Sequence, residues 1–221
     1  MIISGDGVME NRLETVKEIF NRLDSTTFNH SVRVMALAME YEEYAGLDHN
    51  ILSQAALVHD IGKVYVSNKI LDKIGRLSKL EHLLVDLHPY IGYSMLKERG
   101  IREDIARIVL YHHGFKPPML SEVSMEYEDK GFVNYASQVL RTIDAFEALT
   151  SDRPYHRGIS AVEATNLLKK QGFDENDGYY FLAKVAFSQS SETSAVLRGN
   201  YLNINDSLDD ILKNWESDNC E

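Results

Sequence analysis

The sequence predicts an all-α fold, and three observations support this. Apolar residues recur at helical spacing along almost the whole chain. The alternation typical of strands is weak, apart from short pieces such as Val64-Tyr65-Val66. A hydrophobic content of 44% supplies enough apolar side chains for a buried helical core.

The expected helices can be placed by their apolar stripes and by their start and stop residues. Gly46 is the expected stop of the second helix, and Pro89 suits the first turn of a later one. The apolar stripes, in chain order, cover Leu13 to Leu23, His30 to Ala45, Ile51 to Val58, Pro89 to Leu96, Ile101 to His113, Val139 to Asp144 and Ala161 to Lys170. Residues Gly114 to Gly131, with two prolines, are expected to form an irregular connection.

A length of 221 residues suits one large domain, or one domain with a small appendage. We expect an N-terminal helix in residues 1–25 and the main domain in residues 26–187. Residues 188–221 are acidic and less regularly apolar, so we expect a tail that packs on the domain surface or frays.

Composition and charge exclude several classes of protein. No apolar stretch approaches the length of about 18 residues that a membrane span needs, and the N-terminus lacks the pattern of a signal peptide. The single Cys220 cannot form an internal disulfide, so a cytoplasmic location is expected. The net charge of −11 argues against general nucleic-acid binding. A small anionic substrate remains compatible with it, because metal ions and a few cations can dominate a pocket.

His59-Asp60 is the most informative pair in the chain, because it directly follows the apolar run Ala55 to Val58. That run should be buried, and burial of a charged carboxylate without a partner costs several kcal/mol or more. A divalent metal ion is a suitable partner, because carboxylates and neutral imidazoles are both good ligands for such ions.

Further imidazoles and carboxylates lie on apolar faces or at helix ends. One such histidine alone is more often a hydrogen-bonded core residue, but the joint pattern favours a two-metal site. The candidate ligands are His30, His59, Asp60, His88, His112, His113 and Asp144. No cysteine joins the set, which disfavours a structural zinc site; mixed imidazole and carboxylate ligands suit iron or manganese, with zinc, nickel, cobalt or magnesium as alternatives.

The same residues resemble the HD superfamily of metal-dependent phosphohydrolases, and the fuller pattern resembles its HD-GYP branch. The resemblance runs from about residue 26 to 170. The matching pieces are His30-Ser31-Val32-Arg33-Val34, His59-Asp60-Ile61-Gly62-Lys63, Ile70-Leu71-Asp72-Lys73, His88-Pro89-Tyr90-Ile91-Gly92, His112-His113 and the stretch from Asp144 to Tyr155. The Gly-Tyr-Pro motif that names the branch is replaced here by Gly114 to Leu120.

The resemblance implies an HD-domain helical bundle around a buried site for two divalent metal ions. One ion would be held by His30, His59, Asp60 and Asp144, and the other by Asp60, His88, His112 and His113, with Asp60 as the bridge. Thr26 stands where members with a third metal carry a Glu, which favours two ions. Lys63 would contact the reacting phosphate as a catalytic residue, and Arg153 and Arg157 would bind other parts of the substrate.

The expected activity is hydrolysis of a phosphodiester, with cyclic di-GMP as the substrate that the resemblance implies. Two alternatives stay open because the Gly-Tyr-Pro motif is missing. One is phosphohydrolase activity on another nucleotide, and the other is a catalytically silent module that binds a nucleotide or a partner. The expected partner is a small anionic nucleotide, and a regulatory protein or a second copy of the chain is left open.

Overall fold

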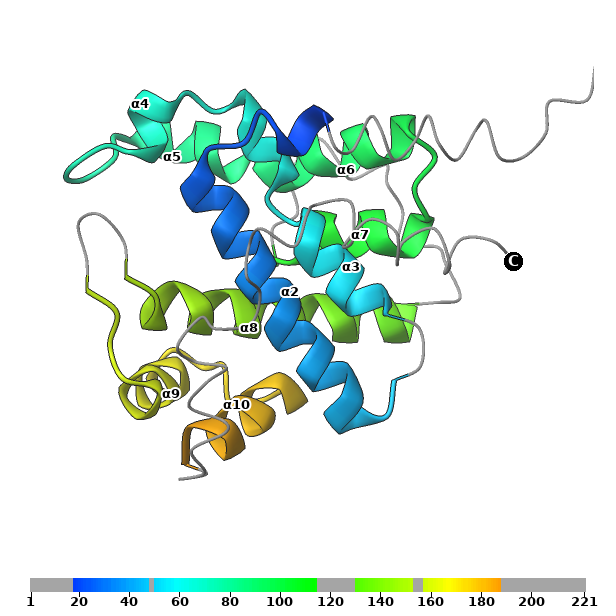
Figure 1. Cartoon of the computed structure of the whole chain (residues 1–221), viewed down its shortest axis with the longest axis vertical. Helices are drawn as coiled ribbons and strands as arrows, with labels where there is room; N and C mark the ends of the chain where they lie inside the picture. Colours follow the sequence, from blue (N-terminus) through cyan, green and yellow to red (C-terminus); the bar gives the residue numbers. More distant parts are fainter. Residues whose placement is uncertain (1–17, 48–49, 115–129, 153–156, 188–221) are drawn as a thin grey trace, which may run out of the picture.

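The computed structural model describes residues 18–47, 50–114, 130–152 and 157–187, and within these ranges the regular elements are all helical. The predicted all-α fold is therefore confirmed (Figure 1). The helices are α2 (Ser25–Ala45), α3 (Ile51–Val58), the 3-10 helix η1 (Ile61–Tyr65), α4 (Asn68–Leu71), α5 (Lys79–Asp86), α6 (His88–Glu98), α7 (Glu103–Tyr111), α8 (Lys130–Thr150), α9 (Ala161–Lys170) and α10 (Asp177–Phe187).

Two long helices of 21 residues each, α2 and α8, cross near the centre of the molecule (Figure 1). The Asp24 side chain caps the start of α2 by accepting a hydrogen bond of 2.9 Å from the Thr27 amide. The helix ends at Gly46, whose φ of 65° is the left-handed conformation that glycine adopts without strain. The predicted stop at Gly46 is therefore confirmed.

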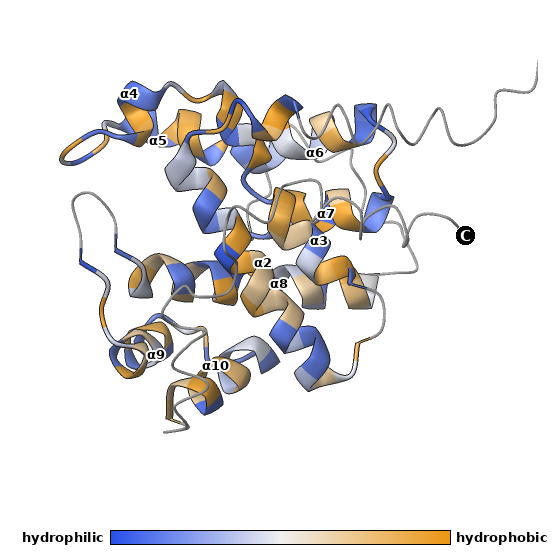
Figure 2. Ribbon diagram, viewed as in Figure 1, coloured by the Kyte–Doolittle hydropathy of each residue, from blue (hydrophilic) through white to orange (hydrophobic). Residues whose placement is uncertain are grey.

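The short helix α3 lies in the middle of the core and packs against α2 and α7. All eight of its residues are buried, and Figure 2 shows it as predominantly apolar. A helix buried on every side can be covered only by neighbours on all faces, which α2, α7 and α8 provide. The position of α3 determines the site, because His59-Asp60 follows directly at its carboxyl end.

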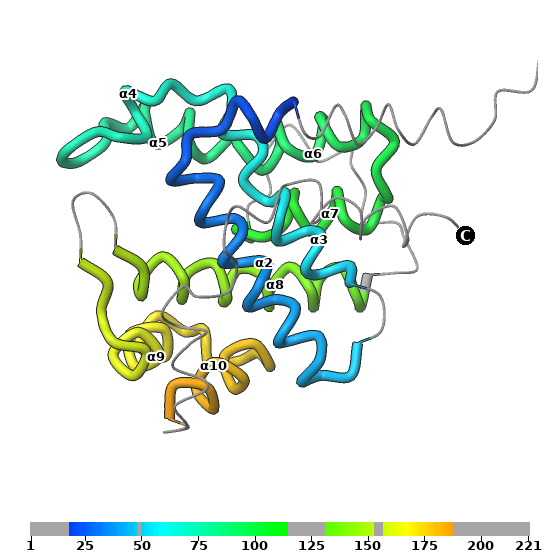
Figure 3. The backbone as a smooth tube through the Cα atoms, viewed as in Figure 1, coloured from blue at the N-terminus to red at the C-terminus, as the bar shows by residue number. Residues whose placement is uncertain are grey.

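The remaining helices cover this core from two sides. α9 and α10 pack on α8 at one end, and α6 packs on α7 and η1 at the other. Between η1 and α6, the α4 and α5 segment projects from the body, as the tube in Figure 3 shows, and neither helix has a buried residue. None of the described helices combines enough length with enough apolar character to cross a lipid bilayer.

The structure corrects two local expectations. Val64 and Tyr65 belong to the 3-10 helix η1 and only Val66 is extended, so the expected strand-like piece is wrong. β-branched residues favour strands only where a neighbouring strand pairs with them, and no described segment does so here. Gly131 lies inside α8 rather than in the irregular connection, most of which falls outside the described residues.

Other expectations fall largely outside the described residues. Glu18 to Phe20 are helical, while the rest of the expected N-terminal helix before residue 18 lies outside the described ranges. The tail 188–221 lies outside them as well. α7 ends at Tyr111, so His112 and His113 form the turn that follows the helix instead of its last residues.

Gly62 is the point of closest approach between η1 and α6. A Cβ atom at this position would lie 2.1 Å from the His88 carbonyl oxygen. We expect Gly62→Ala to lower the free energy of unfolding by about 1–3 kcal/mol, because the backbone of His88 must move to relieve the overlap. Urea unfolding followed by circular dichroism measures this change.

The matched control is Gly131→Ala, because a Cβ atom there would meet nothing within 4 Å and the residue is helical. This variant should range from unchanged to about 1 kcal/mol more stable. Equal stability of the two variants would contradict the assigned close contact.

Candidate metal centre

The fold gathers all seven candidate ligands around the carboxyl end of α3. His30 comes from α2, His59-Asp60 from the junction of α3 with η1, and His88 is the first residue of α6. His112 and His113 follow α7, and Asp144 lies in α8. Three sets have ligand atoms within 4.8 Å of one another: His30, His59 and Asp144; His59, Asp60 and His112; and His88, His112 and His113.

The five imidazole rings form a continuous chain through the core. His59 lies 5.2 Å from His30 and 5.2 Å from His112, measured between ring centroids. His88 lies 5.4 Å from His112 and 5.1 Å from His113. Of the seven candidates, Asp144 is half-buried and His113 is exposed, whereas the others are buried. The cluster therefore reaches the surface on the side of Asp144 and His113.

Three of the histidines are each held by a hydrogen bond of the same kind, from the ring to a backbone carbonyl three residues earlier. The Nδ1 atom of His59 lies 2.7 Å from the carbonyl oxygen of Ala56. The Nδ1 atom of His88 lies 2.7 Å from the carbonyl oxygen of Val85, and Nδ1 of His112 lies 2.6 Å from the carbonyl oxygen of Val109. Because a carbonyl only accepts, Nδ1 must carry the proton in each ring. A neutral ring then presents the lone pair of Nε2, which is the form that binds a metal ion.

The Nε2 atoms of the same three histidines, and Oδ1 of Asp60, are buried without a hydrogen-bond partner. A buried polar atom without a partner normally costs about 1–3 kcal/mol. Four such atoms in one cluster, all of them good metal donors, fit a divalent ion better than a hydrophobic core. The residues present therefore fit the divalent metal ions that the sequence predicts.

Asp60 lies between the two halves of the cluster. Its Oδ1 atom is 3.1 Å from Nε2 of His88. Its Oδ2 atom is 3.4 Å from Nε2 of His59, 3.7 Å from Nε2 of His30 and 2.6 Å from Nζ of Lys63. Burial raises the pKa of this carboxyl, but electrostatic interactions with the His59 ring and the Lys63 ammonium reverse the shift and hold the pKa well below its usual range. Asp60 is therefore ionised, with one oxygen toward each half.

His30 is held differently, between two carboxylates. Its Nε2 atom lies 2.9 Å from Oδ1 of Asp144, and its Nδ1 atom contacts Oε2 of Glu147. Burial lowers the pKa of His30, but hydrogen bonds to Asp144 and Glu147 outweigh burial and raise the pKa to about 9. His30 is thus an imidazolium at neutral pH until a metal ion displaces its Nε2 proton.

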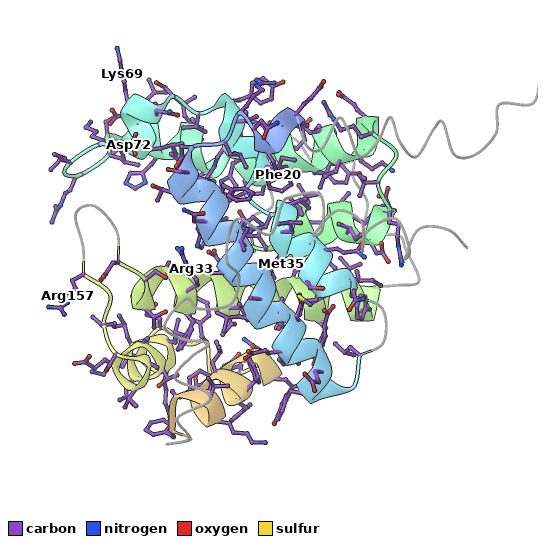
Figure 4. All side chains as sticks on the ribbon, in the orientation of Figure 1. Phe20, Arg33, Met35, Lys69, Asp72 and Arg157 are labelled. Atoms are coloured by element: carbon purple, nitrogen blue, oxygen red, sulfur yellow. The ribbon has the colours of Figure 1, made fainter. Side chains whose placement is uncertain are left out.

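Sequence reasoning missed the roles of Glu147 and Arg33. Glu147 is buried and contacts both Nδ1 of His30 and Nε of Arg33, whose position on α2 is labelled in Figure 4. Burial raises the pKa of Glu147, but the hydrogen bond from His30 reverses this and lowers it to about 2. A carboxylate behind a ligating histidine fixes its orientation. The available signal was a second acid in the apolar helix, one turn after Asp144.

Three imidazoles of the cluster, those of His59, His112 and His113, are held neutral. Burial lowers the pKa of His59 and lowers that of His112 well below its usual range. His113 is exposed as a residue, but its ring packs 4.0 Å from that of His112 by centroid. Desolvation of that ring therefore lowers its pKa to about 4. These lone pairs are available at neutral pH without loss of a proton.

The expected substrate contacts lie at different distances from the cluster. Lys63 touches Asp60 and keeps 21% of its side chain exposed, so it lies where the cluster meets solvent. Arg157 is exposed at the edge of the molecule, as Figure 4 shows, and makes no described contact with the cluster. Arg153 lies outside the described residues. Thr26 is exposed in the first turn of α2.

Comparison with known proteins supports the same family. The sequence matches the model of the HD domain family over residues 27–149. A cyclic di-GMP phosphodiesterase of Pseudomonas aeruginosa is 32% identical over 145 residues, which are 64% of this chain and 34% of that protein. The 3'3'-cGAMP-specific phosphodiesterase 3 of Vibrio cholerae is 27% identical over 168 residues, which are 75% of this chain and 36% of that protein. The chain thus spans about a third of the length of these curated relatives.

A solved structure shows the same fold. The HD domain of the phosphodiesterase PgpH from L. monocytogenes, in complex with cyclic-di-AMP, superposes with a TM-score of 0.50. The match covers 81% of this chain and 92% of that one, at 16% sequence identity. At this low sequence identity, the structural similarity is evidence for the fold alone. The shared fold agrees with the predicted HD-domain bundle.

The position of Asp60 between the two halves predicts that one substitution removes both ions. Wild-type protein purified without chelator should contain two divalent ions per chain, and Asp60→Ala should contain almost none, because each half loses a charged ligand. Elemental analysis together with protein concentration measures the ratio, and circular dichroism should show unchanged helix content. One ion per chain, or full occupancy in Asp60→Ala, would contradict the two-ion assignment.

The pKa of His30 predicts a pH dependence for one half of the site. Below its pKa of about 9, His30 must lose a proton to bind a metal ion, so the affinity of this half rises with pH up to about 9. The half that contains His112 and His113 has neutral imidazoles and should change less between pH 7 and pH 9. Titration of the metal-free protein with Mn²⁺ in buffers of different ionisation enthalpy measures the released protons.

Glu147→Gln serves as the control for this effect. The variant removes one of the two carboxylates that raise the pKa of His30, so fewer protons should be released at pH 8. Equal proton release by wild type and Glu147→Gln would contradict the role assigned to that carboxylate.

Proposed function

The chain belongs to the HD domain family, and on this basis we propose that it is a metal-dependent phosphodiesterase that acts on a cyclic dinucleotide such as cyclic di-GMP. The observation that carries the proposal is the buried Asp60 carboxylate with histidine ligands on both sides. Two-metal sites, with ions roughly 3.5–4 Å apart, support in-line displacement at phosphorus in phosphatases and nucleases.

The division of ligands follows from the contacts of Asp60 and of the surrounding rings. Oδ2 of Asp60 belongs with His30, His59 and Asp144, and Oδ1 belongs with His88, near His112 and His113. Bound in these places, the ions would polarise the phosphoryl group and supply a water of lowered pKa. Hydrolysis is therefore the reaction class that this set of residues supports best.

The exposed edge of the cluster is where a substrate can reach the ligands. Asp144 is half-buried, His113 is exposed and Lys63 is partly exposed, whereas His59, Asp60 and His112 are covered. A phosphodiester that enters at this edge brings its negative charge next to the Lys63 ammonium. That ammonium would neutralise charge that develops on the phosphoryl oxygens, which makes Lys63 the proposed catalytic residue of this chain.

The identity of the cyclic dinucleotide is proposed from relatives that align with this chain over about a third of their own length. One acts on cyclic di-GMP and another on 3'3'-cGAMP, according to their names. Gly114 to Leu120 replace the Gly-Tyr-Pro motif, and residues 115–120 lie outside the described ranges. We therefore expect weaker or altered activity on cyclic di-GMP, with 3'3'-cGAMP as the second candidate substrate. Arg157 and Arg153 are proposed contacts for the phosphate that does not react.

A hydrolysis screen on metal-loaded protein tests the proposal. The panel contains cyclic di-GMP, 3'3'-cGAMP, cyclic di-AMP and a linear dinucleotide, each with Mn²⁺ or with Fe²⁺ under anaerobic conditions. The expected result is cleavage of at least one cyclic dinucleotide, and none by Asp60→Ala. Turnover of the linear compound alone would favour another nucleotide phosphohydrolase. Absence of turnover with every compound would favour a silent binding module.

The position of Lys63 predicts a strong effect on turnover. Lys63→Ala should lower kcat by about 100-fold on the best substrate, because a lost charge contact at the reacting phosphate costs a few kcal/mol in the transition state. Metal content should stay near two ions per chain, since Lys63 is not a ligand. Steady-state kinetics and elemental analysis measure both.

The matched control is Lys169→Ala, because Lys169 is an exposed lysine of α9 that makes no contact with the cluster. Its kinetics should equal those of wild type. A Lys63→Ala enzyme with unchanged kcat would place the reacting phosphate elsewhere.

A further inference from the structure

A cavity of about 700 Å³ lies between α7, α8 and the turn that joins α9 to α10. Its volume falls in the range of small-molecule sites, about 300–1,000 Å³. None of the seven candidate metal ligands lines it. The helix α7 separates the two places, because Arg107 and Tyr111 line the cavity whereas His112, which follows the helix, is buried in the metal cluster. The cavity is therefore distinct from the metal centre.

The charged groups around the cavity are mostly paired with one another. Nη2 of Arg102 lies 2.6 Å from Oδ2 of Asp104. Nε of Arg107 lies 2.6 Å from Oε1 of Glu103. Such pairs contribute no net charge to a ligand bound between them.

Two charged groups of the cavity remain without an ionic partner among the described residues: Arg141 on α8 and Glu175 in the turn before α10. The Arg141 guanidinium lies over the Phe173 ring, 4.9 Å from the centroid. This contact holds the exposed Arg141 cation at the wall, and within the described part of the chain its N–H groups have no hydrogen-bond partner. The cavity thus offers one guanidinium and one carboxylate to a ligand.

The remaining polar lining consists largely of amide side chains. Asn134 and Gln138 on α8 and Gln171 after α9 line the cavity, and each offers both a donor and an acceptor. The Asn176 amide is already engaged, because it donates to Thr142 Oγ1 at 2.9 Å. A ligand that uses all of these groups would carry an anionic group, a pair of donors for a carboxylate, and several hydrogen-bonding atoms between them.

We propose that this cavity is a second ligand site that binds a guanine nucleotide, with GMP as the simplest member of the class. The phosphate would pair with Arg141 in the bidentate manner that guanidinium groups favour. The N1–H and the 2-amino group of guanine would donate to the Glu175 carboxylate. Adenine has an acceptor at N1 and no 2-amino group, so the same carboxylate disfavours it. The proposal does not rest on the proposed phosphodiesterase activity, since binding here requires no turnover.

Isothermal titration of the full chain tests the site, with GMP, AMP, guanosine and inorganic phosphate as probes. GMP should bind at least about tenfold more tightly than each of the other three, because only GMP satisfies both charged groups. Arg141→Met should weaken GMP binding by about tenfold or more, while its apolar stem still covers Phe173. Glu175→Gln should reduce the preference for GMP over AMP. Absence of GMP binding, or equal binding of GMP and AMP, would overturn the proposal.

Two controls separate this site from the metal centre. Arg76→Met removes an exposed arginine far along the chain from the cavity and should leave GMP binding unchanged. Wild type stripped of metal by a chelator should bind GMP with unchanged affinity, after circular dichroism confirms that it stays folded. GMP binding that disappears with the metal and is indifferent to Arg141→Met would assign the nucleotide to the metal centre instead.

Discussion

The burial of the Asp60 carboxylate is the constraint on which the rest of the structure depends. The chain places this charge directly after a helix whose residues are all buried, and among the described residues its Oδ1 atom has no hydrogen-bond partner. The surrounding elements supply what the carboxylate needs: His30 from α2, His88 from α6 and the Lys63 ammonium from η1. The helices that cover α3 are thus the same helices that carry the ligands, so core packing and ligand geometry cannot be varied independently.

The three histidines held by carbonyl groups show how a helical core can build such a cluster at little cost. Each one bonds to a carbonyl in the last turn of a preceding helix: His59 to α3, His88 to α5 and His112 to α7. Carbonyls at that end of a helix lack intrahelical partners, so an imidazole N–H stabilises the helix end. The same bond fixes the tautomer and turns Nε2 toward the cluster. The same hydrogen bond therefore stabilises the end of a helix and orients Nε2 of the histidine for metal binding.

The sequence predicted the all-α fold and the residues that meet in the cluster, because helical periodicity and closely spaced His and Asp are local patterns. It did not predict what depends on long-range contact. Glu147 acquires its role only because α8 crosses α2 at His30, which is 117 positions away. Val64 and Tyr65 have strand-forming side chains, but the tight approach at Gly62 and the absence of a described partner strand leave them in a 3-10 turn. The cavity combines three separate segments and has no local signature.

The two halves of the cluster differ in charge, and the difference follows from which helices meet there. On the side of α2 and α8, His30 lies between Asp144 and Glu147, so a metal ion would meet ionised carboxylates and must displace a proton. On the side of α6 and α7, His112 and His113 are neutral. Carboxylates favour harder ions and imidazoles favour softer ones. Asp60 contributes charge to both halves. On the imidazole side, it supplies the negative charge that the neutral rings lack. Its substitution by a neutral ligand would therefore weaken the imidazole half in particular, because no other carboxylate belongs to that group of ligand atoms.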